Sequence, residues 1–188
     1  MKNVSKTTRM ICEAAICVAL AIGLSYLKID LWFQGGSIDA VMIPLILFSM
    51  RWGAGWGVGA CLVFGTLKYF IGLDSWALDW VSIVFDYSVA YALVGLAGVF
   101  KRRSRLIVPA TLVGCAARFI IHYISGVTVY AKWMPEEFMG MAMTSPFFYS
   151  ALYNGGYMVP NTILAVVVCL ALSKAAPIRK WLDGGDLK

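Results

Sequence analysis

A small set of polar side chains lies deep inside long apolar runs of the sequence. A charged or strongly polar group in a membrane-embedded run is costly, so each one calls for a partner or a function. Carboxylate, guanidinium, imidazole and amide groups at one depth could bind a charged ligand or pass a proton. These side chains are Asp39, Asp86, Arg118, His122 and Asn154.

The depth of these groups follows from counting residues from the basic ends of the apolar runs. At about 1.5 Å rise per residue, Asp86 lies roughly 22 Å from Lys101. By the same count, Arg118 lies roughly 20 Å from Arg105. His122 follows Arg118 by four residues, so the two share one helix face. Because the hydrocarbon core is about 30 Å thick, we expect these groups in its outer half.

Aromatic side chains accompany the polar ones and suggest a pocket for a flat, polar, cationic molecule. Rings stack on such a molecule and attract its positive charge, and a carboxylate neutralises it. A structural alternative stays open, in which Asp86 forms an ion pair with Arg118 that only holds two helices together. Rings near helix ends could equally form an interfacial belt. The aromatic residues are Tyr87, Tyr91, Tyr130, Trp133, Tyr149 and Tyr153.

The sequence gives little support for catalysis, a metal site or a cofactor. His122 is the single histidine, which excludes a multi-histidine metal site. No GxSxG, HExxH or nucleotide-binding motif occurs, so the chain cannot drive transport with ATP alone. The five cysteines lie in apolar runs without a CxxC pair and are expected to be small apolar filler. We therefore predict a binding protein that is not an enzyme.

Composition places the chain in the membrane. Of its 188 residues, 61% are hydrophobic and 14% are charged, and the mean hydropathy is +0.78. A soluble domain carries roughly a quarter of charged residues, and β-barrel strands alternate rather than forming long apolar runs. We predict an all-α integral membrane protein, a single compact bundle of six transmembrane helices over residues 1–188. The predicted helices lie at about 8–27, 38–50, 55–71, 76–100, 106–130 and 145–172; the second and third are short for a span.

Basic residues at the ends of the runs predict the orientation. With six spans, four basic groups fall on one side, which the positive-inside rule assigns to the cytoplasm, while the opposite connections carry mixed charge. Both termini are then cytoplasmic, and the bundle sits in the lipid bilayer of the cell membrane. Because the net charge of +6 sits at the ends of runs, it indicates topology and not nucleic-acid binding. The basic groups are Lys2, Lys6 and Arg9; Arg51; Lys101, Arg102, Arg103 and Arg105; and Lys174, Arg179 and Lys180.

The first predicted helix carries a strip of small residues. Ala15 and Ala19 lie one turn apart, so another helix could approach closely there. This strip either packs inside the bundle or forms a docking face for a partner membrane protein.

Together these motifs resemble the thiamine-specific S components of energy-coupling factor (ECF) transporters, the ThiT family, over nearly the whole chain. Residues 13–21 are similar to the family's AxxxA strip. Asp86-Tyr87 is similar to the family's Glu-Tyr in helix 4, and residues 118–126 are similar to its K-x-x-x-H-x-x-x-G segment. Tyr149 and Asn154 resemble the Tyr and Asn that start helix 6.

The resemblance implies capture of thiamine from outside under a lid. It further implies delivery to a transmembrane coupling protein attached to two ATPase subunits, with Ala15 and Ala19 at the contact. The lid is expected to involve Trp32, Phe33 and Trp133. The thiamine pocket implied by the resemblance consists of Asp86, Tyr87, His122, Gly126, Tyr130, Tyr149 and Asn154.

The chain departs from the family pattern at positions that touch the ligand. Asp86 replaces Glu and is one methylene shorter, Tyr130 stands where the family has a stacking Trp, and the loop through residues 135–137 is longer. A thiamine precursor or another small vitamin is therefore an alternative ligand. A different alternative is a stand-alone proton-coupled secondary transporter in which Asp86, Arg118 and His122 relay protons.

Overall fold

The protein is described here by a computed structural model that covers residues 5–32, 35–72, 80–185 and 187, and it is mostly helical. Most helices begin and end within a few residues of the positions expected from hydropathy. The short last helix was not predicted. The regular α-helices are α1 (Lys6–Ser25), α2 (Met42–Trp52), α3 (Ala54–Phe70), α6 (Ile107–Thr128), α7 (Pro146–Lys174) and α8 (Ala176–Leu182).

The fourth apolar run forms an irregular helix whose geometry changes along its length. It passes from α4 (Trp80–Ser82) into the π-helix η1 (Ile83–Val89), then α5 (Ala90–Val94) and the 3₁₀-helix η2 (Gly95–Phe100). The predicted start of this helix at residue 76 lies outside the described residues. π-Helical turns are rare and occur frequently at functional sites. Asp86 lies in the middle of this one.

Four helical stretches in the described part of the chain are long and apolar enough to cross a membrane. The 11-residue α2 and the 17-residue α3 are shorter than the roughly 20 residues that a straight span needs. A mostly helical membrane protein is therefore confirmed, while six spans and cytoplasmic termini stay predictions. The four stretches are Lys6–Ser25, Trp80–Phe100, Ser104–Thr128 and Pro146–Lys174.

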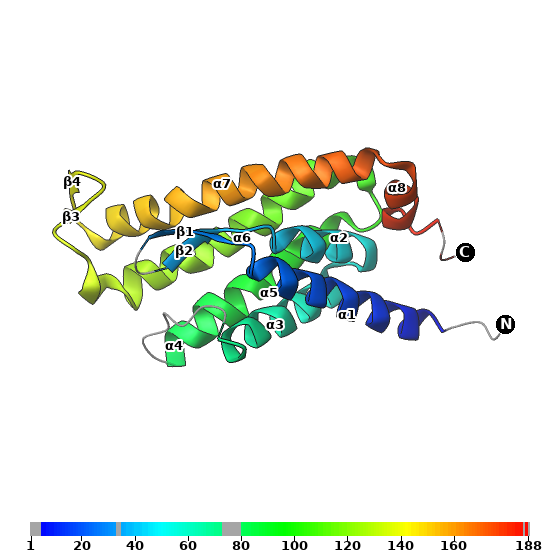
Figure 1. Ribbon diagram of the computed structural model, residues 1–188, viewed down its shortest axis with the longest axis horizontal. Coiled ribbons are helices and arrows are strands. Elements are labelled where there is room, and N and C mark those ends of the chain that lie inside the picture. Colours follow the sequence, from blue (N-terminus) through cyan, green and yellow to red (C-terminus); the bar gives the residue numbers. More distant parts are fainter. Residues whose placement is uncertain (1–4, 33–34, 73–79, 186, 188) are drawn as a thin grey trace.

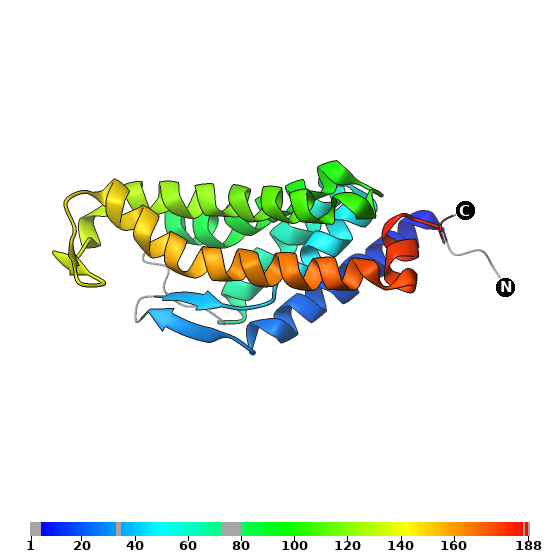
Figure 2. The same cartoon turned by 90° about the horizontal axis from the view of Figure 1, so that it is seen from above.

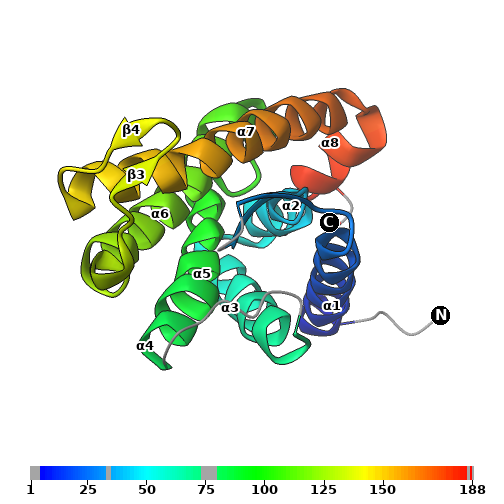
Figure 3. The same ribbon diagram turned by 60° about the vertical axis from the view of Figure 1, so that its left-hand side comes forward.

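The helices form a bundle around α2. Figures 1 and 2 show α6 and α7 lying side by side along the long axis. Figure 3 shows α2 among α1, α3, α7 and α8, and ten of the eleven residues of α2 are buried. Its short length follows from this position, since a helix enclosed by protein need not match the thickness of the bilayer.

Two β-hairpins lie in the half of the molecule away from α8 (Figure 1). The first pairs β1 (Ile29–Trp32) with β2 (Gly35–Ile38), and the second pairs β3 (Glu137–Phe138) with β4 (Met141–Ala142). Hydropathy did not predict these hairpins, because four-residue and two-residue strands leave little periodic signal. They bring loop residues over the ends of the long helices.

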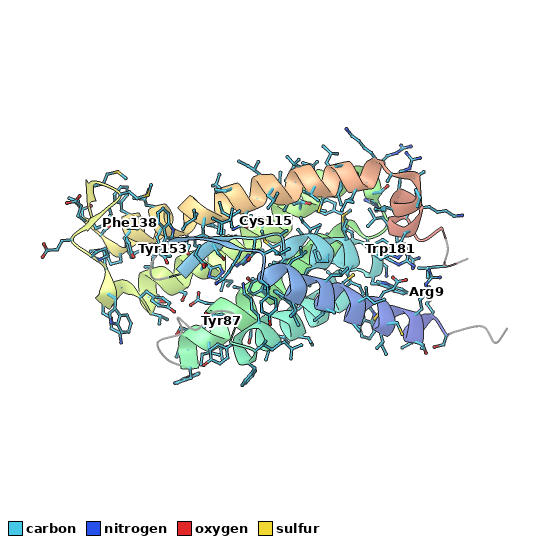
Figure 4. The ribbon with its side chains drawn as sticks, in the orientation of Figure 1. Arg9, Tyr87, Cys115, Phe138, Tyr153 and Trp181 are labelled. Atoms are coloured by element: carbon cyan, nitrogen blue, oxygen red, sulfur yellow. The ribbon has the colours of Figure 1, made fainter. Side chains whose placement is uncertain are left out.

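An ion cluster joins three helices at the opposite end. The carboxylate of Glu13 on α1 accepts hydrogen bonds from Arg51 Nε (2.5 Å) and Trp52 Nε1 (2.8 Å) on α2. Arg51 also donates to the carbonyl oxygen of Trp181 on α8 and stacks on that ring at 4.7 Å. Trp181 lies at this end with Arg9 in Figure 4. Arg51 was expected between the second and third helices, as one of the basic groups that indicate orientation. The structure instead includes it in α2, where it is fully buried.

Candidate functional site

A pocket of about 230 Å³ lies between the first hairpin and the halves of four helical segments that point away from α8. Its walls come from β2, α3, the irregular fourth helix, α6 and α7, with further residues from the segment that follows α6. This pocket is lined by all seven residues that the family resemblance implies for a thiamine pocket. They are Asp86, Tyr87, His122, Gly126, Tyr130, Tyr149 and Asn154.

A chain of hydrogen bonds links the charged groups of the pocket. Arg118 Nε donates to His122 Nε2 at 3.3 Å, and His122 Nδ1 lies 3.0 Å from Asp86 Oδ1. A guanidinium has no acceptor, so Nε2 must be the unprotonated nitrogen of the ring. The imidazole is therefore neutral, and Nδ1–H donates to the Asp86 carboxylate.

The second oxygen of the Asp86 carboxylate also accepts a hydrogen bond. Ser125 Oγ donates to Asp86 Oδ2 at 2.8 Å. Asp86 is thus aimed into the pocket by two residues of α6, and its negative charge lacks a cation in direct contact among the described residues. A cationic ligand would supply that charge.

The alternative ion pair between Asp86 and Arg118 does not form directly in the described structure. The His122 ring lies between the two side chains, and the guanidinium instead donates to Tyr91 OH at 2.9 Å and stacks on that ring at 4.1 Å. Arg118 Nη1 is buried without a hydrogen-bond partner. The helices are joined through a histidine and a tyrosine rather than by a salt bridge.

The width of the π-helix depends on a glycine of the neighbouring helix. An ideal Cβ at Gly65 of α3 would collide with the backbone carbonyl oxygen of Tyr87. Thr66 Oγ1 lies 3.1 Å from Ser88 Oγ, which adds a polar contact between the same two helices. Close approach at Gly65 therefore lets η1 widen without losing its packing on α3, and it positions Asp86 and Tyr87.

Asn154 is part of a second hydrogen-bond network, on α7. Its Nδ2 donates to the carbonyl oxygen of Ser150 at 3.0 Å, and its Oδ1 accepts from Tyr157 OH at 2.9 Å. Gly126 of α6 faces this network, where an ideal Cβ would collide with Ser150 Oγ. Gly126 is therefore a packing position between α6 and α7 as well as part of the pocket wall.

Aromatic rings cover the pocket beneath the first hairpin. Trp32 of β1 packs edge-on against Phe138 of β3 at 5.1 Å, and Phe138 lies 5.7 Å from Tyr153. Phe138 and Tyr153 lie near each other at this end in Figure 4. Tyr153 OH donates to the carbonyl oxygen of Gly35 at 2.9 Å, which ties the hairpin to α7. Trp32 thus belongs to an aromatic cluster with Phe138 and the pocket residue Tyr153, whereas Phe33 lies outside the described residues.

Three further aromatics among the predicted residues also line the pocket: Tyr87, Tyr130 and Trp133. Tyr87 is buried and meets the Tyr69 ring at 5.3 Å. Tyr130 and Trp133 both line the pocket, with ring centroids 6.2 Å apart, and Trp133 remains 42% exposed. Trp133 therefore lies at the rim, with Lys132 Nζ 4.0 Å from its ring.

Sequence analysis missed a buried lysine on the pocket wall. Lys68 of α3 is 2% exposed and lines the pocket. Its Nζ donates to Tyr91 OH at 2.9 Å and lies 3.6 Å from Asp39 Oδ2. The sequence did contain a signal for this residue. A lysine inside an apolar helix is as costly as Asp86, so it also requires a partner or a function. Ser125 and Tyr157 were missed as well, because both are ordinary residues for a membrane helix.

The small-residue strip of α1 lies away from the pocket. Ala15 and Ala19 are both exposed, and the neighbouring Ile16 and Leu20 are 60% and 56% exposed. This face is not used for packing inside the bundle. Within the described residues no group of three His, Cys, Asp or Glu side chains could hold a metal ion.

Comparison with known proteins gives one consistent result. Residues 11–180 match the family described as Thiamine transporter protein (Thia_YuaJ). The chain is 33% identical to the thiamine transporter ThiT of Bacillus subtilis (strain 168), over 95% of this chain and 97% of that protein. It is 27% identical to the ThiT of Lacticaseibacillus paracasei, over 89% and 88% of the two chains.

A solved structure shares the fold. ThiT from Listeria monocytogenes superposes with a TM-score of 0.82, at 22% identity, over 95% of this chain and 99% of that one. With the family match over most of its length and the 33% identical relative, the chain belongs to the thiamine transporter (ThiT) family, a family of membrane transporters and not of enzymes.

Proposed function

We propose that this protein is the substrate-binding S component of an ECF transporter and that the pocket around Asp86 captures thiamine. The observation that carries the proposal is the Asp86 carboxylate, which two α6 side chains orient into a cavity lined with tyrosines. Thiamine combines a permanently cationic thiazolium ring with an aminopyrimidine. A carboxylate and stacked aromatic rings are the groups that such a molecule requires.

The proposed binding mode follows from the chemistry of the two ligand rings. Asp86 compensates the positive charge or accepts a hydrogen bond from the pyrimidine amino group. His122 and Asn154 complete the polar contacts, and Tyr87, Tyr130 and Tyr149 stack on or flank the rings. The rings of Trp32 and Trp133 close the pocket from the hairpin side and from the rim. Because these groups are already held by the protein, little ordering is required when the ligand binds.

The proposed topology has six spans, with both termini and α8 in the cytoplasm. The start of α1, the connection between η2 and α6, and α8 lie at one end of the molecule (Figure 1), and these segments carry most of the basic residues. The residues that line the pocket come from the other half of the long helices. The positive-inside rule then places the pocket on the outer side. Ligand would enter from outside, beneath the two hairpins.

The proposed partners are a transmembrane coupling protein and two ATPase subunits. The exposed strip around Ala15 and Ala19 supplies a smooth face on which a helix of the coupling protein can pack. The chain carries no nucleotide-binding motif, so in this proposal ATP hydrolysis occurs in the partners.

Titration of the purified full-length protein with thiamine, followed by tryptophan fluorescence, tests this function. Trp32 and Trp133 lie at the pocket, so we expect saturable quenching at micromolar thiamine or below. The absence of any response at that concentration would overturn the thiamine assignment.

A thiamine precursor is the second candidate ligand. Asp86 is one methylene shorter than the Glu of the resembled family, which leaves more space in front of the carboxylate. The same titration with the isolated hydroxymethylpyrimidine and thiazole halves separates the candidates. Tighter binding of either half than of thiamine would favour the precursor.

A further inference from the structure

Three arginine side chains within four residues of the sequence surround an open depression at the end of the molecule opposite the pocket. The depression has a volume of about 420 Å³ and is lined by the segment between η2 and α6, together with Asp183 after α8. Its arginines follow the span Trp80–Phe100 and border the span Ser104–Thr128. They therefore lie at the membrane boundary. The three are Arg102, Arg103 and Arg105.

Among the described residues that line the depression, the one carboxylate is already engaged. Asp183 Oδ1 accepts from the backbone N–H of Ser104 and Asp183 Oδ2 accepts from Ser104 Oγ, both at 2.8 Å. No ion pair joins any of the three arginines to a carboxylate within the described part of the chain. As far as the described residues go, the depression therefore keeps an excess of positive charge and guanidinium donors not used in ion pairs.

Arg102 is held in an unusual conformation. Its φ is +56°, in the left-handed region that non-glycine residues rarely adopt, and its N–H donates to the carbonyl oxygen of Met50 at 2.7 Å. Its Nε is buried and has no hydrogen-bond partner. An ideal Cβ at Gly184 would lie 2.9 Å from that Nε, so the glycine leaves the space that the guanidinium occupies. An unpaired buried donor on a strained residue costs stability unless something binds it.

We propose that Arg102, Arg103 and Arg105 bind the phosphate group of an anionic phospholipid at the membrane surface. Guanidinium groups match phosphate oxygens with paired, charge-assisted hydrogen bonds. A lipid is favoured over a soluble phosphate because the side chain of Val99, three residues before Arg102, is 68% exposed at the end of the span. An acyl chain can lie there while its headgroup meets the arginines. Basic clusters next to a span are typical anionic-lipid sites.

Native mass spectrometry of the detergent-solubilised full chain tests the proposal. The probes are phosphatidylglycerol and phosphatidylcholine with identical acyl chains. We expect the wild-type protein to retain phosphatidylglycerol at least about tenfold more tightly than phosphatidylcholine. The variant Arg102→Gln/Arg103→Gln/Arg105→Gln should lose that preference. Equal retention of the two lipids by the wild type would overturn the proposal.

A matched triple variant separates a site from general positive charge. Lys174→Gln/Arg179→Gln/Lys180→Gln removes three exposed charges from the same end of the molecule. We expect it to change phosphatidylglycerol binding by no more than about twofold. An equal loss in both triple variants would overturn the proposal in favour of unspecific attraction.

Two further arms identify the occupant. Inorganic phosphate at millimolar concentration should not displace the lipid; displacement would assign the site to a soluble phosphate instead. If the arginine variant binds lipid normally but no longer assembles with the coupling protein, the occupant is an acidic protein surface, and the lipid proposal fails.

If the triple arginine variant does not fold, the double variant Arg103→Gln/Arg105→Gln, at two exposed positions, replaces it. It should reduce the preference for phosphatidylglycerol at least about threefold. Thiamine affinity is read in parallel, so failure of the vitamin site and failure of the lipid site are distinguishable.

Discussion

His122 donates a hydrogen bond from Nδ1 to Oδ1 of Asp86 at 3.0 Å, and this contact determines how the pocket presents its negative charge. The imidazole is neutral because its other nitrogen accepts from Arg118. Asp86 is therefore oriented by hydrogen bonds without being neutralised by them. A site built in this way retains a full negative charge for a cationic ligand.

The charge of Asp86 should dominate thiamine affinity. Asp86→Asn keeps the size of the side chain and removes the charge, and we expect thiamine affinity to fall by about 10- to 100-fold, equivalent to about 1.5–3 kcal/mol. Isothermal titration or fluorescence titration measures the change. Asp30→Asn is the control, because Asp30 is exposed on β1 and pairs with Lys28. Equal affinities of Asp86→Asn and wild type would show that Asp86 has only a structural role.

Arg118 should act on the ligand through the tautomer of His122. Arg118→Met removes the donor to Nε2, so the imidazole can place its proton on either nitrogen. His122 is the only histidine in the chain, so ¹⁵N-histidine labelling gives a single pair of ring signals. We expect the Nδ1–H tautomer in the wild type and a mixture in Arg118→Met, with about a tenfold loss of thiamine affinity.

Arg118→Lys is the control for this experiment, because it keeps a cation in place. It should retain most of the affinity. An unchanged tautomer in Arg118→Met would contradict the role that we assign to the arginine.

The sequence predicted the depth of the charged residues but not how they pair. Counting residues placed Asp86, Arg118 and His122 at similar depths, and all three line one pocket. The count assumed a regular rise, whereas Asp86 lies in a π-helix that rotates its side chain relative to a regular helix. Which of two nearby partners a carboxylate contacts depends on such a rotation. The ion pair of Asp86 with Arg118, which the sequence left open as an alternative, does not form here, and Asp86 bonds to His122 instead.

The two hairpins and the buried Lys68 show a second limit of structure prediction from the sequence. The first outer loop was expected to be a lid, but nothing in its composition distinguishes a hairpin from an irregular loop. Lys68 was not among the predicted site residues; it lies in the last turn of α3, where a basic residue is common. Its partner Asp39 lies 29 residues earlier, and only the fold brings the two charges within 3.6 Å of each other. Long-range pairing of this kind is not encoded in local pattern.

Close packing at two glycines should hold the pocket open. An added Cβ at Gly65 meets the Tyr87 carbonyl, and one at Gly126 meets Ser150. We expect Gly65→Ala and Gly126→Ala each to destabilise the protein by about 1–3 kcal/mol and to weaken thiamine binding. Thermal unfolding in detergent measures the first effect.

Gly155→Ala is the matched control for these two variants. Gly155 also lies within a helix, and no heavy atom approaches its ideal Cβ within 4 Å. Alanine there should be neutral or stabilise the protein by up to about 1 kcal/mol. A comparable loss of stability in all three variants would mean that the losses do not arise from contact between helices.

Trp32 should slow the release of the ligand. Its ring packs on Phe138 and lies close to Gly36 and Gly156, so it joins the first hairpin to the second hairpin and to α7. We expect Trp32→Ala to raise the dissociation rate of radiolabelled thiamine about tenfold with a smaller effect on association. Trp56→Ala is the control, because Trp56 is 57% exposed on α3. An unchanged dissociation rate would remove Trp32 from the cover.

The exposed strip of α1 should matter for transport and not for binding. Ala19→Trp adds a large side chain to the strip, so a partner helix can no longer approach closely. We expect ATP-driven thiamine uptake in vesicles with the complete transporter to fall by about tenfold or more, and thiamine affinity of the isolated protein to stay within about twofold. Val167→Trp adds the same ring to an exposed position on α7 and should leave uptake unchanged. If both variants transport normally, the coupling protein docks on another face; if both fail equally, the added bulk acts through the lipid bilayer rather than through docking.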